Sequence, residues 1–148
     1  MLEHYTPHPI RVCVTGGTGF VALHLIYQLL LKGYHVNTTM RNVSTGKPQI
    51  IQALLNYHSS DPENSIATLS HDLLEERLTC FNADLNQEGS FEKAIQHCQF
   101  VHHTASPVAL DVKDPQKELV DTAVQGTLNV LRECEIEKMA TTATNCIS

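Results

Sequence analysis

Hydrophobic and polar positions follow two different periods along the chain, and their succession predicts strands separated by helices. Short apolar runs and two-residue alternation predict strands over residues 10–14, 34–41, 78–83 and 100–105. Apolar spacing of three and four predicts helices over residues 20–32, 49–58, 90–97 and from Asp114 to about Glu133, with a weaker helical pattern over 66–76. Polar, proline-containing stretches predict a turn over 42–48 and a loop over 59–65. This order predicts an α/β fold of the Rossmann type, a doubly wound parallel sheet with strand order 3-2-1-4.

Two helix boundaries carry recognisable end signals. Gly33 follows the first helix, where a left-handed glycine commonly ends a helix. Asp114 and Pro115 form an N-cap and first-turn pair that opens the last predicted helix.

The link between the first strand and the first helix is rich in glycine. Gly16, Gly17 and Gly19 lie where the backbone turns sharply, and Ala22 follows one helical turn later. This is the G-x-G-x-x-G/A pattern, in which glycines allow close approach of a dinucleotide pyrophosphate to the amides of a helix N-terminus. A tight strand-to-helix turn without a ligand is the alternative. The strand before the pattern and the helix after it favour a nucleotide site.

The end of the second strand indicates which nucleotide is bound. NAD sites usually place an acidic residue there to bind the ribose 2′-hydroxyl. Residues 41–48 instead offer Arg41 and Lys47 and no carboxylate. A guanidinium binds a 2′-phosphate through its planar fork, so the sequence favours NADP(H). A solvated arginine at a strand end is the alternative.

The ends of the third and fourth strands supply further candidate residues. Asp84 and Leu85 follow the third strand at the edge where such sheets bind ligands, and the Asp84 carboxylate could accept from an adenine amino group. The alternative, that Asp84 only caps a turn in the loop, is equally consistent with the sequence. The segment Thr104–Pro107 follows the fourth strand, and its small side chains would let the chain pass a nicotinamide ribose.

Composition limits the classes of function. The chain has 148 residues, which suits one domain, and its formal net charge of −6 without a basic block argues against nucleic-acid or membrane-surface binding. The longest apolar run, residues 20–31, is too short to span a bilayer. Residues 1–9 lack the apolar core of a signal peptide and are expected to form a flexible arm. Five scattered cysteines without a C-x-x-C pair favour a reducing, cytoplasmic location.

The chain offers little evidence for metal or nucleophilic catalysis. His102 and His103 are adjacent in a predicted strand, so their side chains point to opposite faces and do not chelate one ion together. Neither a metal-ligand spacing nor a nucleophile elbow is present in the sequence, so no metal site is predicted.

The segments that carry these features resemble the extended short-chain dehydrogenase/reductase superfamily. Within it they are most similar to the plant-type branch of dihydroflavonol 4-reductase, anthocyanidin reductase, cinnamoyl-CoA reductase and vestitone reductase. The likeness runs from about residue 10 to 134 and rests on residues 12–21, 33–41, 81–85, 89–91, 103–108 and 114–132. It implies an NADP(H)-binding Rossmann domain of the NAD-dependent epimerase/dehydratase type over residues 10–134.

The resemblance assigns roles to the matching positions. It implies that the glycine segment holds the pyrophosphate of NADP(H) through Thr15, Gly16, Gly17, Thr18, Gly19, Phe20 and Val21. Arg41, with Lys47 nearby, would bind the 2′-phosphate, and Asp84 and Leu85 would flank the adenine. The nicotinamide side would be lined by Thr104, Ala105 and Ser106.

The resemblance also exposes a missing part. Family members transfer hydride to a carbonyl with a serine and a Y-x-x-x-K pair, whose tyrosine gives or takes the proton. Lysine does not stand four residues after any tyrosine of this chain, namely Tyr5, Tyr27, Tyr34 and Tyr57. No catalytic residue is therefore predicted, and family chains are expected to be about twice as long. The chain is expected to be inactive alone.

Three functional classes follow. The first is the NADP(H)-binding portion of a reductase acting on CH-OH groups, truncated before the catalytic pair and substrate domain. The second is a non-catalytic nucleotide-binding or regulatory protein that pairs with a full-length paralogue. The third is a poorly folding relic.

The end of the chain departs from the family. Residues 135–148 form a divergent tail in which no fifth strand is predicted, so the sheet is expected to be truncated after about four strands. The fourth strand would then be an exposed edge available for pairing with a partner, and the stability of the chain would be marginal.

Overall fold

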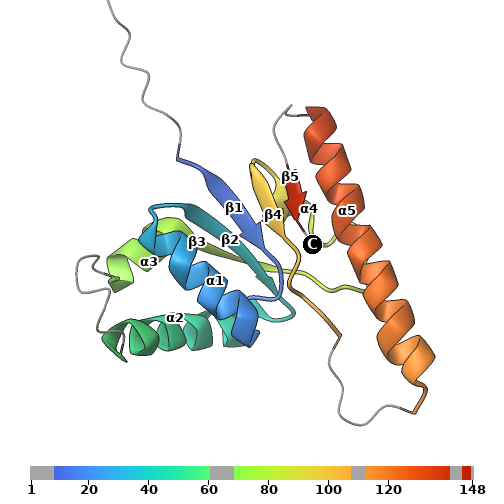
Figure 1. Cartoon of the computed structure of the whole chain (residues 1–148), viewed down its shortest axis with the longest axis horizontal. Coiled ribbons are helices and arrows are strands. Elements are labelled where there is room, and N and C mark those ends of the chain that lie inside the picture. Colours follow the sequence, from blue (N-terminus) through green and yellow to red (C-terminus); the bar gives the residue numbers. More distant parts are fainter. Residues whose placement is uncertain (1–8, 61–68, 108–112, 141–144, 148) are drawn as a thin grey trace, which may run out of the picture.

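The computed structural model describes residues 9–60, 69–107, 113–140 and 145–147. Five strands form one parallel sheet in the order β3-β2-β1-β4-β5 (Figure 1). The strands are β1 (Arg11–Val14), β2 (His35–Met40), β3 (Leu78–Asn82), β4 (Phe100–His102) and β5 (Asn145–Ile147). The predicted Rossmann-type sheet with order 3-2-1-4 is confirmed, and a short fifth strand extends it.

Helices cover both faces of this sheet (Figure 1). On one side lie α1 (Phe20–Leu31), α2 (Val43–Ser60) and α3 (His71–Arg77); on the other lie α4 (Glu92–Ile95) and α5 (Thr122–Ala140), the latter preceded by a π-helical stretch, Gln116–Asp121. Alternate residues of β1 point into the two cores, since Val12 and Val14 join the first and Cys13 joins the second. Each face therefore has its own buried cluster.

The interior strand β2 is buried on both faces although three of its buried residues are polar. Asn37, Thr38 and Thr39 are at most 3% exposed. The Asn37 amide donates to the Ala94 carbonyl at 2.8 Å, and the Thr38 hydroxyl donates to the Val14 carbonyl at 2.8 Å. These bonds satisfy the polar groups that the position of the strand removes from water.

The predicted helix ends are confirmed. Gly33 has φ +83°, and the amides of Gly33 and Tyr34 donate to the carbonyls of Leu30 and Leu29 at 3.0 and 3.1 Å, which closes α1. The Asp114 carboxylate accepts from the Lys117 amide at 3.3 Å at the start of the last helical region.

The predicted turn over residues 42–48 is wrong, because α2 already begins at Val43. Two asparagines cap this helix: Asn42 Oδ1 accepts from the Thr45 amide at 3.4 Å, and Asn82 Oδ1 accepts from the Val43 amide at 2.8 Å. Pro48 lies only five residues after the start, where a missing amide hydrogen removes a single helical bond. The predicted helix 49–58 is confirmed as the later part of α2.

The predicted open edge at β4 is also wrong. Residues 100–102 pair in parallel with β5, and α5 continues to Ala140 beyond its predicted end near Glu133. The sequence pattern does not reveal β5 because the strand is only three residues long and contains a polar residue. Pairing through the backbone alone leaves little pattern in the side chains.

Several other predictions fall partly outside the described residues. These are the N-terminal arm, residues 61–65 of the predicted loop 59–65 and the start of the helix predicted over 66–76, of which α3 confirms the later part. The loop prediction is wrong for residues 59 and 60, which form the end of α2. Among the helices in the described ranges, none combines the length and the apolar character needed to cross a membrane.

Candidate functional site

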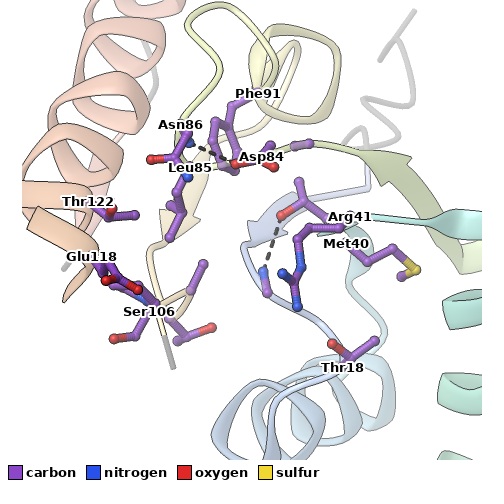
Figure 2. Close-up of a pocket in the computed structure, with 16 residues that line it drawn as sticks. Thr18, Met40, Arg41, Asp84, Leu85, Asn86, Phe91, Ser106, Glu118 and Thr122 are labelled. Atoms are coloured by element: carbon purple, nitrogen blue, oxygen red, sulfur yellow. Dashed lines mark hydrogen bonds between the residues drawn. The ribbon is translucent and has the colours of Figure 1, made fainter. Parts of the chain in front are cut away.

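A pocket of about 370 Å³ lies at the carboxyl edge of the sheet, where β1 to β4 end (Figure 2). Ligands of open parallel sheets bind at this edge, next to the point where strand order reverses. Four segments line the pocket together with the start of the last helical region: Gly16, Thr18, Thr39, Met40, Arg41, Ala83, Asp84, Leu85, Asn86, Phe91, Thr104, Ala105, Ser106, Pro107, Glu118 and Thr122.

The glycine turn forms one wall of the pocket. Gly16 has φ +74°, and its amide donates to Thr39 Oγ1 at 3.1 Å. A Cβ atom on Gly16 would lie 2.8 Å from the Ala105 Cα atom, so only glycine fits between the turn and the segment after β4. Gly17 is buried, and its amide donates to the Thr39 carbonyl at 2.9 Å. The turn therefore brings bare backbone to the pocket, as a pyrophosphate site requires.

The helix that follows the turn offers an uncapped N-terminus. Gly19 is the N-cap of α1 and provides no side-chain cap, and the first turn contains no acidic residue. Such an end carries partial positive charge and favours an anion. Phe20 and Val21 are exposed and do not line the pocket, so any contribution of theirs would come from the backbone.

Arg41 reaches the same space from the end of β2. Figure 2 shows its guanidinium pointing into the pocket above Thr18. Within the described part of the chain no hydrogen bond or ion pair engages this side chain. Lys47 is placed differently: its ammonium forms an ion pair with Glu75 Oε2 at 3.0 Å and does not line the pocket. The structure thus brings Arg41, but not Lys47, to the predicted site.

Asp84 fits both interpretations that the sequence allowed. Its Oδ1 atom accepts from the Asn86 amide at 2.8 Å, and its backbone is bonded to the Ser90 hydroxyl, as expected of a turn-capping aspartate. The residue also lines the pocket beside Leu85. Leu85 is fixed from α5, because the Asn129 amide donates to its carbonyl at 2.8 Å.

The segment after β4 forms the opposite wall and contains the three predicted residues Thr104, Ala105 and Ser106. Thr15 is buried behind this wall and does not line the pocket. The Thr15 hydroxyl accepts from the amides of Thr104 and Ala105 at 3.1 and 3.0 Å. Thr15 therefore positions the two walls relative to each other.

Sequence reasoning missed part of the lining. Thr39 and Met40 are the last residues of β2, so their position at the carboxyl edge was available as a signal. Glu118 and Thr122 reach the pocket from the start of the last helical region, and only the packing of that region against the sheet brings them there. Within the described ranges no three histidine, cysteine or acidic side chains are grouped as a metal site.

Comparison with known proteins finds reductases among the similar sequences. Residues 14–148 match the model of an NAD-binding family described as "Male sterility protein". The chain is 42% identical over 123 residues to cinnamoyl-CoA reductase CAD2 of Medicago truncatula, covering 83% of the chain and 33% of that relative. It is 43% identical over 136 residues to an anthocyanidin reductase of Vitis vinifera, covering 87% of the chain and 34% of that relative.

A solved structure supports the same comparison. Gre2 from Candida albicans, determined in complex with NADPH, superimposes with a TM-score of 0.63 at 32% identity, over 86% of this chain and 33% of that one. The chain thus spans about one third of the length of its relatives, less than the half expected from the sequence. The resemblance to the plant-type reductase branch is confirmed.

Proposed function

We propose that this chain, which belongs to the NAD-binding family described as male sterility protein, binds NADP(H) at the carboxyl edge of its sheet. The observation that carries the proposal is the meeting of the glycine turn and Arg41 in one pocket. The turn supplies bare backbone and an open helix end for a pyrophosphate, and Arg41 supplies a guanidinium for the 2′-phosphate. The structure of Gre2, which has a similar fold and was determined in complex with NADPH, supports NADP(H) as the nucleotide.

The remaining walls fit the other parts of the nucleotide. We assign Asp84 and Leu85 to the adenine side, because they stand at the end of β3 beside Arg41 at the end of β2. Thr104, Ala105 and Ser106 stand at the end of β4 and would line the nicotinamide side. When bound, the nicotinamide supplies a hydride. The residues of this chain bind and orient the nucleotide.

We further propose that the chain is the nucleotide-binding portion of a reductase that transfers hydride to a carbonyl. Its relatives are about three times as long. The sequence lacks a Y-x-x-x-K pair, so the proton donor for the carbonyl oxygen is missing from these residues. Assayed alone with NADPH and either a dihydroflavonol or a cinnamoyl thioester, the chain is expected to show no turnover. NADPH oxidation by the purified chain would contradict this assignment.

Titration of NADPH and NADH against the whole chain tests the nucleotide assignment. NADPH is expected to bind more tightly, and Arg41→Ala is expected to weaken NADPH binding about tenfold to a hundredfold while changing NADH binding little. The reason is that only NADPH carries the phosphate that the guanidinium would bind. Equal affinity for the two nucleotides, unchanged in Arg41→Ala, would overturn the assignment.

Lys47→Ala is the matched control in the same titration. It removes one positive charge from the same strand-to-helix region, but that ammonium already pairs with Glu75. We expect less than about a threefold change in NADPH affinity, because an exposed ion pair contributes little and the site keeps Arg41. A loss as large as that of Arg41→Ala would instead assign Lys47 to the phosphate.

A further inference from the structure

Thr15 is the junction between the glycine turn and the segment that leaves β4. Five hydrogen bonds connect it to residues 102–105. Its amide donates to the His102 carbonyl at 3.0 Å, and its carbonyl accepts from the Thr104 hydroxyl at 2.5 Å. The remaining three bonds meet at one atom, the Thr15 hydroxyl oxygen, which is fully buried.

The number of hydrogen bonds that this oxygen can donate and accept determines whether His103 Nδ1 carries a hydrogen. A hydroxyl has one hydrogen to donate and two lone pairs. The amides of Thr104 and Ala105 occupy both lone pairs, at 3.1 and 3.0 Å. The hydroxyl hydrogen must therefore go to His103 Nδ1, which lies 2.8 Å away. That nitrogen has to be an acceptor, so a neutral His103 carries its hydrogen on Nε2.

The second ring nitrogen extends the connection to a third element. His103 Nε2 lies 3.3 Å from the Thr127 hydroxyl on α5, which accepts its hydrogen. One imidazole thus links the glycine turn and the β4 segment to the helix that closes the pocket. The same bonds hold Ala105 against Gly16, where a Cβ on the glycine would lie 2.8 Å from the Ala105 Cα atom.

We propose that His103 is a positioning residue of the nucleotide site, which holds the two pocket walls together only as the neutral Nε2-hydrogen tautomer. This inference rests on the proposed NADP(H) site, whose walls it aligns. His103 does not line the pocket itself. Its effect on the ligand passes through Thr15 and the backbone of Thr104 and Ala105.

Protonation would break this arrangement. Protonation adds a hydrogen to Nδ1, so the Thr15 hydroxyl loses its acceptor. Three donors then point at its oxygen: the protonated Nδ1 and the amides of Thr104 and Ala105. Burial lowers the pKa of His103 from its ordinary value near 6.5, and no charged group contributes to the shift. The bonded groups that face the ring, Thr15 from the glycine turn and Thr127 from α5, are neutral, and His102 precedes it on the strand. Nucleotide affinity is therefore expected to fall in acid.

The tautomer can be measured without a nucleotide. Long-range ¹H–¹⁵N NMR of the whole chain with ¹⁵N-labelled histidine distinguishes a bare ring nitrogen from one that carries hydrogen. At pH 7.5 we expect His103 Nδ1 to be bare and Nε2 to carry the hydrogen. Hydrogen on Nδ1, or rapid exchange between tautomers, would overturn the proposal whether or not NADP⁺ binds.

Affinity for NADP⁺ tests the positioning role. His103→Leu removes both hydrogen bonds of the imidazole ring and is expected to weaken NADP⁺ binding about tenfold, because it leaves the buried Thr15 hydroxyl without an acceptor. His103→Asn is the conservative variant, because its amide oxygen still accepts from Thr15 without titrating, and it should stay within about threefold of the unmodified chain. Equal affinity of both variants and the unmodified chain would overturn the role. Failure of the unmodified chain to bind NADP⁺ would instead refute the nucleotide site.

The pH profile separates this role from a merely structural one. The 2′-phosphate also titrates near pH 6, but it does so equally in every variant. We therefore expect the affinity of the unmodified chain to fall relative to His103→Asn as the pH decreases below about 6.5, towards the lowered pKa of His103. Parallel profiles for these two proteins would contradict the proposal. This comparison stands even where His103→Leu fails to fold.

Discussion

At the scale of single residues, position 17 has no room for any side chain. A Cβ atom on Gly17 would lie 3.0 Å from Ile50 Cδ1 and 3.1 Å from Thr38 Cγ2, and closer still to Thr38 Oγ1. Gly17→Ala is therefore expected to lower the free energy of unfolding by about 1–3 kcal/mol, measured by urea denaturation at unchanged slope.

Thr38→Ala provides the matched background for that measurement. It removes the two Thr38 atoms that a Cβ on Gly17 would meet, although it also loses the bond to the Val14 carbonyl. The cost of Gly17→Ala should be smaller in this background than in the unmodified chain, because neighbouring substitutions that share a contact are not additive. The same cost in both backgrounds would show that the overlap with Thr38 is not the cause.

The thiols of three cysteines are expected to react slowly at neutral pH. Burial raises the pKa of Cys13 well above its usual range, that of Cys80 to about 11 and that of Cys98 to about 12. Since the thiolate is the reactive form, alkylation of the buried Cys13 and Cys98 at pH 7.5 should require unfolding, whereas the half-buried Cys80 should react slowly in the folded chain. Peptide mass spectrometry with and without urea measures this directly. Rapid labelling of Cys13 or Cys98 in the folded chain would contradict the expectation.

Local sequence was sufficient for some site residues and insufficient for others. Gly16 and Arg41 were predictable because a turn after a strand, or the last residue of a strand, fixes their place at the carboxyl edge. Lys47 was not, because its orientation depends on Glu75 of α3, which is distant in sequence. The family resemblance implied that Thr15 contacts the pyrophosphate, yet its side chain is buried behind the pocket wall.

At the scale of elements, α5 is held against the pocket through a close contact between Gly126 and Leu85. A Cβ on Gly126 would lie 2.6–3.0 Å from three Leu85 side-chain atoms, and Leu85 lines the pocket. Gly126→Ala is expected to displace Leu85 and weaken NADPH binding several-fold, even though alanine favours the helix by about 1 kcal/mol. Calorimetric titration of the folded variant measures the affinity.

Val124→Ala, on the exposed side of the same helix, is the control for that substitution. Val124 is 55% exposed and does not line the pocket, so its truncation should leave NADPH affinity unchanged. Wild-type affinity in Gly126→Ala would mean that Leu85 moves without disturbing the site.

Elements with a strong side-chain pattern were predictable, and those defined by the backbone were not. The alternation of apolar strands and helices identified β1 to β4 and the order of the sheet. The start of α2 was missed because capping by Asn82 is a contact between distant segments. β5 was missed because its three residues are recognised by their pairing with β4 rather than by an apolar run.

At the scale of the whole molecule, nucleotide binding should be visible as added stability. A ligand that binds only the folded state at one hundred times its dissociation constant adds about 2.7 kcal/mol. For a chain of this size the melting temperature should rise by roughly 5–10 °C with NADPH. Arg41→Ala should reduce the shift at the same concentration. An unchanged melting temperature at this NADPH concentration would contradict binding of the nucleotide to the folded chain. The marginal stability expected from the sequence rested on an open β4 edge, which pairing with β5 removes.

Acid should destabilise the folded chain, because burial lowers the pKa values of three histidines, His35, His102 and His103. For His35 the charges of Arg11 and Arg77 add to the effect. In the unfolded chain each imidazole binds a proton near pH 6.5, whereas in the folded chain it binds one only at lower pH. The unfolded state therefore takes up more protons than the folded state as the pH falls. The stabilisation that these neutral imidazoles give the folded state is complete above pH 6.5 and is lost as the pH falls below it.

One carboxyl group acts in the opposite direction. Burial and the neighbouring Glu92 and Glu88 raise the pKa of Glu133 from about 4.5. Urea denaturation at intervals from pH 7.5 to 5.5 should therefore give a decreasing free energy of unfolding, less steep in His103→Asn. A constant or increasing value across that range would show that these imidazoles titrate alike in the folded and unfolded states.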